Sequence, residues 1–328
     1  MTAARPRITL RTGPANTRIL GLGSALGNRV VTNHDLAKTI DTSDEWIRER
    51  VGIISRRLSD PEQTLVGMGI EAGSKAVADA GLAAAEIDTL IFATCTMPGP
   101  IPNAAAQTAD AIGITAGAAF DLNAACAGFS YALGTASDLI RGGSSRRALV
   151  IGAERFTDWV DWEDRANAII FGDGAGAAVV GPADEPGIGP VVWGSAGDLA
   201  QTIRLRDGRY IYQEGQSVFR WATTKIAPVA EDAVAAAGLT LSDIDALVPH
   251  QANLRIVEAI AKRLRAKGAR EDLVVARDIV HTGNTSAASI PIALDHMRAA
   301  GEISRGDVVL LVGFGAGLSY AGQVVVCP

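Results

Sequence analysis

The chain has 328 residues, of which 48% are hydrophobic and 20% are charged, so it can bury a large core and accommodate two domains or one duplicated fold. Its net charge of −6 argues against general nucleic-acid binding. Its cysteines, Cys95, Cys126 and Cys327, are too few and too scattered for a disulfide framework or a zinc site. No stretch resembles a signal peptide or a membrane span, and we expect a cytoplasmic protein with no membrane partner.

A helix followed by a strand is predicted between residues 76 and 90. Residues 76–82 form a helical pattern that ends at Gly81, a residue suited to the position just after a helix. The apolar run that begins at Ile87 predicts a short buried strand.

The next segment contains a candidate nucleophile, Cys126. Residues 118–120 predict a strand, and Phe129, Leu133 and Ala136 recur on one face of the helix expected after it. At such a junction, free N–H groups and the helix dipole favour thiolate over thiol. The small neighbours of Cys126 leave room for a substrate carbonyl. A buried core cysteine is the alternative that this segment alone leaves open.

A glycine-rich segment, residues 172–176, resembles a nucleotide loop only superficially. It lacks the G-x-G-x-x-G spacing and enters an apolar strand at residues 177–180 instead of opening a helix. We interpret it as a tight turn with structural glycines. The turn-rich stretch 181–187 then predicts a boundary between two halves, residues 1–182 and 183–328.

The early helix and strand recur in the second half at a constant offset. Residues 233–239 repeat the pattern of residues 76–82, and residues 244–247 repeat that of residues 87–90, with 233 − 76 = 244 − 87 = 157. The match predicts an internal duplication of an α/β unit. Adding 157 to 126 gives 283, so we expect the turn at residues 281–286 to face the Cys126 turn across a pseudo-twofold axis.

The second half supplies two polar candidates, His250 and Asn284. His250 follows the predicted strand 245–248 and precedes a helix, while Asn284 lies in a Gly-Asn-Thr-Ser turn. Each also has a purely structural interpretation. His250 could be a histidine whose hydrogen bonds are all made locally, and Asn284 could be a helix N-cap. Cys, His and Asn at three strand ends nevertheless match a known solution for thioester chemistry. His34 and His296 lie on patterns of solvated helix, and we assign them no role.

Six motifs resemble those of the β-ketoacyl-ACP synthase III family. Three surround the polar candidates: NAACAGF at residues 123–129, VPHQANLR at 248–255 and HTGNTSAAS at 281–289. The others are TSDEWI at 42–47, FGDGAGA at 171–177 and GFGAGL at 313–318. They follow the family's order over nearly the whole chain. The resemblance implies an α/β thiolase-like fold, a homodimer whose subunit is a duplicated, five-layered α-β-α-β-α sandwich with the nucleophile in the first half and His and Asn in the second.

The resemblance also implies roles for the candidate residues. Cys126 would accept an acyl group from acyl-CoA. His250 and Asn284 would bind the thioester carbonyl of malonyl-ACP and stabilise the enolate formed as CO₂ leaves, giving 3-oxoacyl-ACP. The backbone N–H groups of Cys126 and Ala316 would form the oxyanion hole. No metal and no tightly bound cofactor is implied, because acyl-CoA is a substrate.

Two sets of binding residues follow from the same resemblance. The residues matched to CoA binding are Thr42, Trp46, Arg50, Arg165 and Asn253. Those matched to carrier-protein binding are Gln251, Ala252, Asn253, Leu254 and Arg255. Residues 251–268 hold five Lys and Arg against one Glu, a net charge of +4 on a chain of net −6. This local charge suits an acidic carrier, although an ordinary solvated face is the alternative.

Two departures from the family pattern concern the acyl pocket. Ile101 occupies the position that reaches into the partner's pocket, where Phe is common in enzymes that prefer acetyl. The segment that usually covers the pocket is longer in the family than it is here, where only residues 196–213 remain. Both changes predict a roomier pocket for branched or medium-length acyl groups, although a shortened segment can also collapse inward.

Other functions are distinguished by single residues. A degradative thiolase needs a second cysteine near residues 313–318, which contain none, and elongating synthases carry His where Asn284 stands. An acyltransferase of a natural-product pathway, which moves the acyl group from Cys126 to an alcohol or amine, stays open. A non-catalytic scaffold that binds carrier protein is disfavoured while Cys126, His250 and Asn284 are all present.

Overall fold

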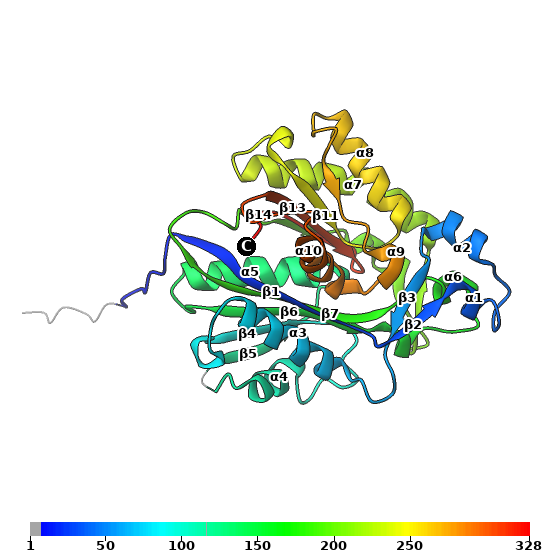
Figure 1. Ribbon diagram of the computed structural model, residues 1–328, viewed down its shortest axis with the longest axis horizontal. Helices are drawn as coiled ribbons and strands as arrows, with labels where there is room; N and C mark the ends of the chain where they lie inside the picture. The colour runs from blue at the N-terminus through cyan, green and yellow to red at the C-terminus, as the bar shows by residue number, and fades with distance from the viewer. Residues whose placement is uncertain (1–7, 116) are drawn as a thin grey trace, which may run out of the picture.

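The computed structural model describes residues 8–115 and 117–328, which contain two five-stranded mixed sheets (Figure 1). The first sheet has the order β1-β7-β6-β4-β5 and the second the order β12-β11-β13-β14-β8. The strands of the first sheet are β1 (Asn16–Leu26), β4 (Thr89–Ala93), β5 (Ala118–Leu122), β6 (Ala148–Arg155) and β7 (Asp173–Ala183). Those of the second are β8 (Val192–Ser195), β11 (Ala246–Pro249), β12 (Val274–Val275), β13 (Val308–Gly315) and β14 (Ser319–Val326).

Helices cover both sheets and fill the space between them (Figure 1). The outer face of the first sheet packs on α3 (Leu65–Asp79) and α4 (Ala104–Ile112), and that of the second on α7 (Gly215–Ala236) and α8 (Leu254–Ala266). Between the sheets lie α5 (Gly128–Arg141) and α10 (Ser289–Ala299). Because the central strands are buried on both faces, they are mainly apolar, as in the first six residues of β6, Ala148–Ala153. The five-layered α-β-α-β-α arrangement that the resemblance implied is therefore present.

The two halves share one topology, as the sequence repeat predicted. Read from β1 and from β8, the strand orders of the two sheets match position by position. The offset is 157 from β4 to β11 (246 − 89), but 161 between the 3-10 turns η2 (Ala125–Ala127) and η6 (Ser286–Ala288), since 286 − 125 = 161. The counterpart of Cys126 is therefore Ala287, and the projection onto residue 283 is wrong. Four extra residues enter the second half between β11 and η6.

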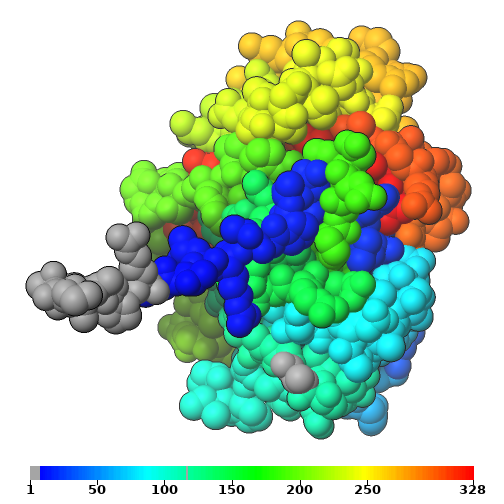
Figure 2. Space-filling view, turned by 90° about the vertical axis from the view of Figure 1, so that its left-hand side faces the viewer, coloured from blue at the N-terminus to red at the C-terminus, as the bar shows by residue number. Residues whose placement is uncertain are grey.

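The boundary predicted between residues 182 and 183 lies at the end of β7. All strands of the first sheet precede residue 184, and all strands of the second follow residue 191. The division into halves 1–182 and 183–328 stays a prediction. Figure 2 shows the second half, in yellow and orange, lying against the cyan and green segments of the first.

Smaller elements surround the ends of the central strands. They are β2 (Arg29–Thr32), β3 (Ser55–Leu58), β9 (Ile203–Arg206), β10 (Tyr210–Gln213), α1 (Asn33–Leu36), α2 (Asp44–Val51), α6 (Arg165–Ala168) and α9 (Ile279–Thr282), with the 3-10 turns η1 (Ala84–Glu86), η3 (Phe156–Trp159), η4 (Gly197–Thr202) and η5 (Leu241–Asp243). β2 pairs with β3, and β9 with β10. Over the described residues, the helices are all too short or too polar to cross a membrane.

Candidate active site

Cys126 lies in a sharp turn between β5 and α5, at the wall of a cavity of about 300 Å³. Ala125, just before it, has a φ of 46°, a left-handed conformation that turns the chain abruptly. Gly315, at the end of β13, passes so close that a Cβ there would lie 2.5 Å from the Cys126 Cβ. The absence of a side chain at Gly315 is therefore what lets β13 approach the cysteine.

Burial raises the pKa of the Cys126 thiol to about 11. Hydrogen bonds from the Ser286 hydroxyl and from the N–H groups of Ala316 and Cys126 itself lower the pKa, but desolvation has the larger effect. The prediction of a thiolate favoured by the helix start is therefore wrong for the unliganded site, because the full burial of the thiol is a tertiary feature. At neutral pH the cysteine is a thiol and must lose its proton when it attacks.

The N–H groups of Ala316 and Cys126 converge on the cysteine sulfur. Two such donors at the reacting centre are the arrangement that an oxyanion hole requires. The sequence motif at residues 313–318 matched Ala316 to this role, and the glycines on either side keep the backbone accessible.

His250 follows β11, and its N–H donates to the carbonyl of Val312 (2.8 Å). Its Nδ1 lies 2.7 Å from Ser289 Oγ, which also accepts the Gln251 N–H at 3.2 Å. We assign the ring proton to Nε2, so that Nδ1 accepts the Ser289 proton. Burial lowers the pKa of His250 to about 3, which makes the ring a neutral hydrogen-bond donor.

Asn284 presents its amide N–H groups to the same cavity. Its Oδ1 accepts the Ser286 N–H (2.8 Å), so Nδ2 is the end that can bind a carbonyl. Its backbone is bound to the segment before β7: the Asn284 N–H donates to Ile170 O (2.9 Å), and the Gly172 N–H donates to Asn284 O (3.0 Å). A Cβ at Gly172 would lie 2.3 Å from Thr282 O. This glycine is structural, as predicted, but the tight turn expected at residues 172–176 is wrong, because Asp173–Gly176 already belong to β7 and pair with β1 and β6.

Cys126, His250 and Asn284 all line the one cavity. The rest of its wall is mainly apolar and includes Phe156, Trp159, Phe171, Ile203, Leu205, Ile211, Val218 and Phe314. The cavity thus combines one nucleophile with two neutral donors and an apolar wall that suits an acyl chain.

The shortened segment 196–213 still covers the acyl pocket. It forms the β9–β10 hairpin, and Ile203, Leu205 and Ile211 of that hairpin line the cavity. The expectation of missing cover is therefore wrong, because a two-stranded hairpin with a tight turn reaches the pocket with few residues. Ile101 is 88% exposed on the connection between β4 and α4 and does not line this cavity.

The residues matched to CoA binding gather around α2. Arg165 Cζ lies 4.8 Å from the centroid of the Trp46 ring, and Arg50 Cζ lies 6.0 Å from it. An adenine between Trp46 and Arg165 requires the two side chains to move apart. Arg165 is also held by the carbonyl of Asp41 (3.1 Å). Thr42 Oγ1 is buried and has no hydrogen-bond partner in the described part of the chain.

The residues matched to carrier binding do not form one surface. Gln251 is fully buried, donates to Pro249 O (2.8 Å) and accepts from the Ile279 N–H (3.2 Å), so it links β11 to α9. Its assignment to the carrier is wrong, because a carrier protein cannot reach it. Ala252 lines the cavity.

The remaining three lie at the start of α8. Leu254 packs against the cluster around α2, and Asn253 is the N-cap, whose Oδ1 accepts the Arg255 N–H (2.9 Å). Arg255 is exposed, with its guanidinium 5.4 Å from the Phe219 ring centroid. Lys262 and Arg263 are exposed further along the same helix.

Sequence reasoning missed three polar residues of the site: Glu154, Ser286 and Ser289. Glu154 is fully buried at the end of β6, and an isolated acid in that apolar strand was the available signal. In residues 8–115 and 117–328, no group of three or more His, Cys, Asp or Glu side chains is placed to hold a metal ion.

Comparisons with known proteins agree with the geometry. Two family models match, 3-oxoacyl-[acyl-carrier-protein] synthase III at residues 120–197 and its C-terminal domain at residues 234–327. The chain is 49% identical to a β-ketoacyl-[acyl-carrier-protein] synthase III of Streptomyces glaucescens, over 96% of this chain and 98% of the relative. It is 50% identical to synthase III 4 of Streptomyces coelicolor, over 95% and 99%.

Solved structures of similar proteins have the same fold. The priming β-ketosynthase of the R1128 polyketide pathway superposes with a TM-score of 0.94 at 43% identity, covering 98% of this chain and 99% of that one. The 3-oxoacyl-[acyl-carrier-protein] synthase III of Aquifex aeolicus gives 0.90 at 37% identity, covering 95% and 100%. The chain therefore belongs to the β-ketoacyl-ACP synthase III family and is a condensing acyltransferase with the thiolase fold.

Proposed function

We propose that Cys126, His250 and Asn284 divide the family's decarboxylative condensation between them. The observation that carries this assignment is their convergence on one cavity in complementary states: a thiol, a neutral imidazole with Nε2–H, and an amide with its Nδ2 free. Each state matches one task, which is to attack a thioester or to donate to a carbonyl.

In the first half-reaction, Cys126 attacks the thioester of an acyl-CoA. Negative charge develops on the carbonyl oxygen, and the N–H groups of Cys126 and Ala316 stabilise it. The carbon–sulfur bond to CoA then breaks, which leaves an acyl thioester on Cys126 and releases CoA.

In the second half-reaction, malonyl-ACP binds with its thioester carbonyl between His250 Nε2–H and Asn284 Nδ2–H. Loss of CO₂ leaves an enolate, whose oxygen both donors stabilise without giving up a proton. The enolate carbon attacks the acyl carbon, the carbon–sulfur bond to Cys126 breaks and frees the cysteine, and the product leaves as 3-oxoacyl-ACP. No bound cofactor takes part in these steps, and we place the protein in the cytoplasm, where both thioesters are formed.

Two groups of residues would bind the carriers of the acyl and malonyl groups. Trp46, Arg50 and Arg165 offer an aromatic face and two cations for the nucleotide of CoA. The exposed cations of α8, beginning at Arg255, face solvent and suit an acidic carrier protein.

A homodimer is the proposed assembly. Among residues 8–115 and 117–328, β5 is an edge strand of the first sheet with no strand paired on its outer side, so it can pair with the β5 of a second copy. Ile101, 88% exposed, is a large apolar side chain that such a partner would cover. In this arrangement Ile101 enters the partner's acyl pocket.

We propose a branched or medium-length acyl-CoA as the donor. The apolar wall of the cavity supports burial of several methylenes, each worth about 0.8 kcal/mol. Ile101 also leaves more room than Phe. Competition among acetyl-, isobutyryl- and hexanoyl-CoA, scored by the mass added to Cys126, tests this: Ile101→Phe should shift the preference toward acetyl, and an acetyl preference in the unchanged protein would contradict it.

Reconstitution tests the function as a whole. The protein, an acyl-CoA and malonyl-ACP should yield equimolar CO₂ and 3-oxoacyl-ACP. Release of CoA without CO₂ when an alcohol or amine is supplied instead would favour the natural-product acyltransferase.

A further inference from the structure

Arg56, on β3, has a fully buried guanidinium to which the steps above give no role. Its Nη1 donates to Val31 O (3.3 Å), and its Nη2 donates to Asn33 Oδ1 (2.8 Å) and to Ile169 O (3.0 Å). Among the residues that the structure describes, it forms no ion pair and its Nε has no hydrogen-bond partner. Burial lowers the pKa of Arg56 to about 10, so the side chain is still a cation at neutral pH.

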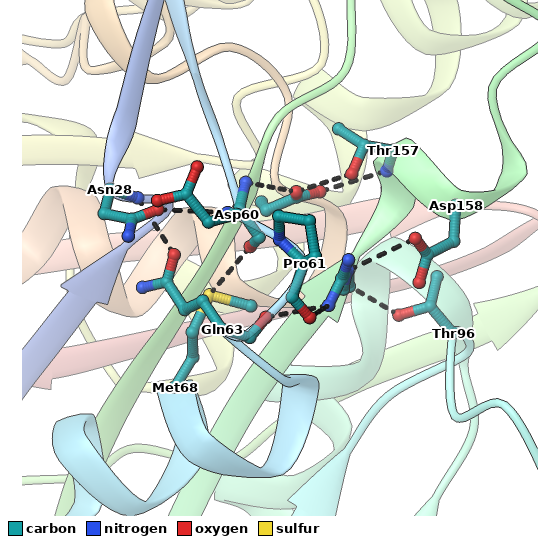
Figure 3. A network of polar contacts seen from close by, with 11 residues as sticks. Asn28, Asp60, Pro61, Gln63, Met68, Thr96, Thr157 and Asp158 are labelled. Atoms are coloured by element: carbon teal, nitrogen blue, oxygen red, sulfur yellow. Dashed lines mark hydrogen bonds and ion pairs between the residues drawn. The ribbon is translucent and has the colours of Figure 1, made fainter.

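A buried cation without an anion is costly, and most buried charges are paired. Arg155 provides the contrast in the network of Figure 3, because it donates to the carbonyls of Gln63 (2.9 Å) and Pro61 (3.4 Å) but also has a carboxylate partner, Asp158 (3.2 Å). The cost of burying Arg56 is offset by hydrogen bonds to neutral oxygens. Those oxygens therefore indicate what the guanidinium holds together.

The Asn33 side chain extends the contact with Arg56 to α2. Because a guanidinium can only donate, Oδ1 is the end of the Asn33 amide that faces Arg56. Asn33 Nδ2 donates to Ile53 O (2.7 Å) and to Asp44 Oδ1 (2.9 Å). Asp44 is the first residue of α2, the helix that carries Trp46. Arg56 is therefore two hydrogen bonds away from the start of α2.

The other partner of Arg56 Nη2 belongs to the segment that carries Arg165. Ile169 directly follows α6 as its C-cap, and Arg165 is the first residue of that helix. Each terminal nitrogen of a guanidinium carries two protons, so Nη2 can make both of its bonds at once. Arg165 Cζ lies 4.8 Å from the Trp46 ring centroid. One nitrogen of Arg56 thus binds, directly or through Asn33, to both helices at the proposed adenine site.

The strand that carries Arg56 is itself fixed to the second half of the chain. Just before β3, the Ile54 N–H donates to Val280 O (2.8 Å). A Cβ at Gly283 would lie 2.9 Å from the Arg56 Cβ, so the turn around Gly283 packs closely against β3. Arg56 therefore reaches α2 and α6 from a strand that is held in place independently of them.

We propose that Arg56 is a positioning residue for the nucleotide of CoA. It holds the backbones of α2 and α6 at a fixed spacing, so that only the side chains of Trp46 and Arg165 part when the adenine enters between them. Lysine cannot replace it, because one ammonium on a flexible stem does not reproduce the planar fork that binds the three oxygens. This role rests on the proposed function, in which Trp46 and Arg165 bind the nucleotide.

Two acyl donors distinguish this role from a merely structural one. Butyryl-CoA contains the nucleotide, whereas butyryl-N-acetylcysteamine has the same thioester without it. In Arg56→Lys, the KM for loading from butyryl-CoA should rise on the order of tenfold, and the rate at saturation should change less than about twofold, since the nucleotide contacts contribute equally to ground state and transition state. Loading from butyryl-N-acetylcysteamine should not change. A similar loss with both donors, or an unchanged KM for butyryl-CoA, overturns the proposal.

Asp44→Ala tests the same connection from outside the core. It removes the acceptor of Asn33 Nδ2 and leaves the buried Arg56 in place. The KM for butyryl-CoA should rise several-fold, and loading from butyryl-N-acetylcysteamine should not change. Asp44 also pairs with Arg48 (2.7 Å), so Arg48→Ala is the matched control and should leave the KM for both donors unchanged. If Arg56→Lys does not fold, this comparison decides: a KM that rises no more in Asp44→Ala than in Arg48→Ala overturns the proposal.

Two further variants separate the role of Arg56 from the CoA site itself. Arg155→Lys changes an arginine that binds residues 61–63 and not α2 or α6, and it should leave the KM for both donors unchanged. Trp46→Ala should raise the KM for butyryl-CoA, and an unchanged KM there contradicts the proposed CoA site. A KM that is raised in Trp46→Ala but unchanged in Arg56→Lys contradicts the role of Arg56 alone. Thermal melting of each variant confirms that it is folded.

Discussion

Ala125 and Ser286 occupy equivalent positions in the two halves, and both are non-glycine residues with positive φ, 46° and 50°. Each is the first residue of a 3-10 turn that leads directly into one of the two central helices. One turn presents Cys126, and the other brings the Ser286 hydroxyl to the Cys126 sulfur. Backbone strain of this kind persists where the surrounding structure enforces it, often at functional sites. The duplication thus places one strained turn at the nucleophile and a copy of that turn beside it.

Gly315→Ala should impair loading without removing any polar group. The new Cβ would lie 2.5 Å from the Cys126 Cβ and 2.9 Å from its Sγ, so the nucleophile must shift. A misplacement of about 1 Å costs roughly 100-fold in rate, and we expect a loss of that order in butyryl-CoA loading. Gly197→Ala, where a Cβ meets nothing within 4 Å, is the matched control and should load normally. Normal loading by Gly315→Ala would mean that this close approach is unimportant.

His250→Ala and Asn284→Ala should separate the two half-reactions. Both donors act on the malonyl thioester, so condensation should fall about 100-fold or more while acyl loading persists. Because the pKa of His250 is about 3, its ring stays neutral from pH 5 to 8, and condensation should show no inflection near the ordinary histidine pKa of about 6.5. Rates of CO₂ release and of mass gain on Cys126 measure the two steps. An equal loss in both would assign these residues to the nucleophile.

His296 should make stability depend on pH. Its Nδ1 lies 2.7 Å from Asp278 Oδ1, and this hydrogen bond raises the pKa of His296, with Asp295 acting in the same direction and Arg57 against it. The stabilisation is complete below the unfolded pKa of about 6.5 and is lost as pH rises through the raised folded value. Because the His296 side chain is 36% exposed, we expect at most about 1 kcal/mol.

Urea unfolding of the unchanged protein and of His296→Asn at pH 5.5 and pH 9 measures this contribution. The difference in unfolding free energy should be larger at pH 5.5. A difference that grows toward pH 9 would contradict the pairing.

The basic face of α8 should act on the carrier protein and not on CoA. Arg255→Glu combined with Lys262→Glu should raise the KM for malonyl-ACP several-fold, more at low salt, where exposed charges are least screened. Loading from butyryl-CoA should not change. Lys75→Glu, an exposed charge reversal on α3, is the matched control. An unchanged KM for malonyl-ACP in the α8 variant would indicate that this face is an ordinary solvent-exposed surface with no role in carrier binding.

The sequence predicted the parts of the fold that depend on local pattern. The helix ending at Gly81 and the strand after Ile87 recur 157 residues later, and that repeat was enough to predict a duplicated sheet. The rise of the offset to 161 at Ser286 could not be predicted, because the four residues inserted before η6 carry no repeat of their own. His296 was read as solvated, since its partner Asp278 lies on another element.

Individual site residues could be predicted only where a sequence motif included the reactive side chain. Cys126, His250 and Asn284 fall within motifs, whereas the partners of Glu154 come from residues 94–96 and 286, far apart in the chain. The raised pKa of Cys126 depends on burial by both halves, which no local pattern encodes. Gln251 lies within a motif, yet its side chain turns inward to bind Pro249 and Ile279.

The central claim is that Cys126 carries the acyl group, and intact-mass analysis after incubation with butyryl-CoA tests it most directly. The unchanged protein and Cys327→Ser should each gain one acyl group. Cys126→Ser should gain none, because a serine hydroxyl has no comparable anionic fraction at neutral pH. Acyl mass on Cys95 or Cys327 in the Cys126→Ser protein would contradict the account.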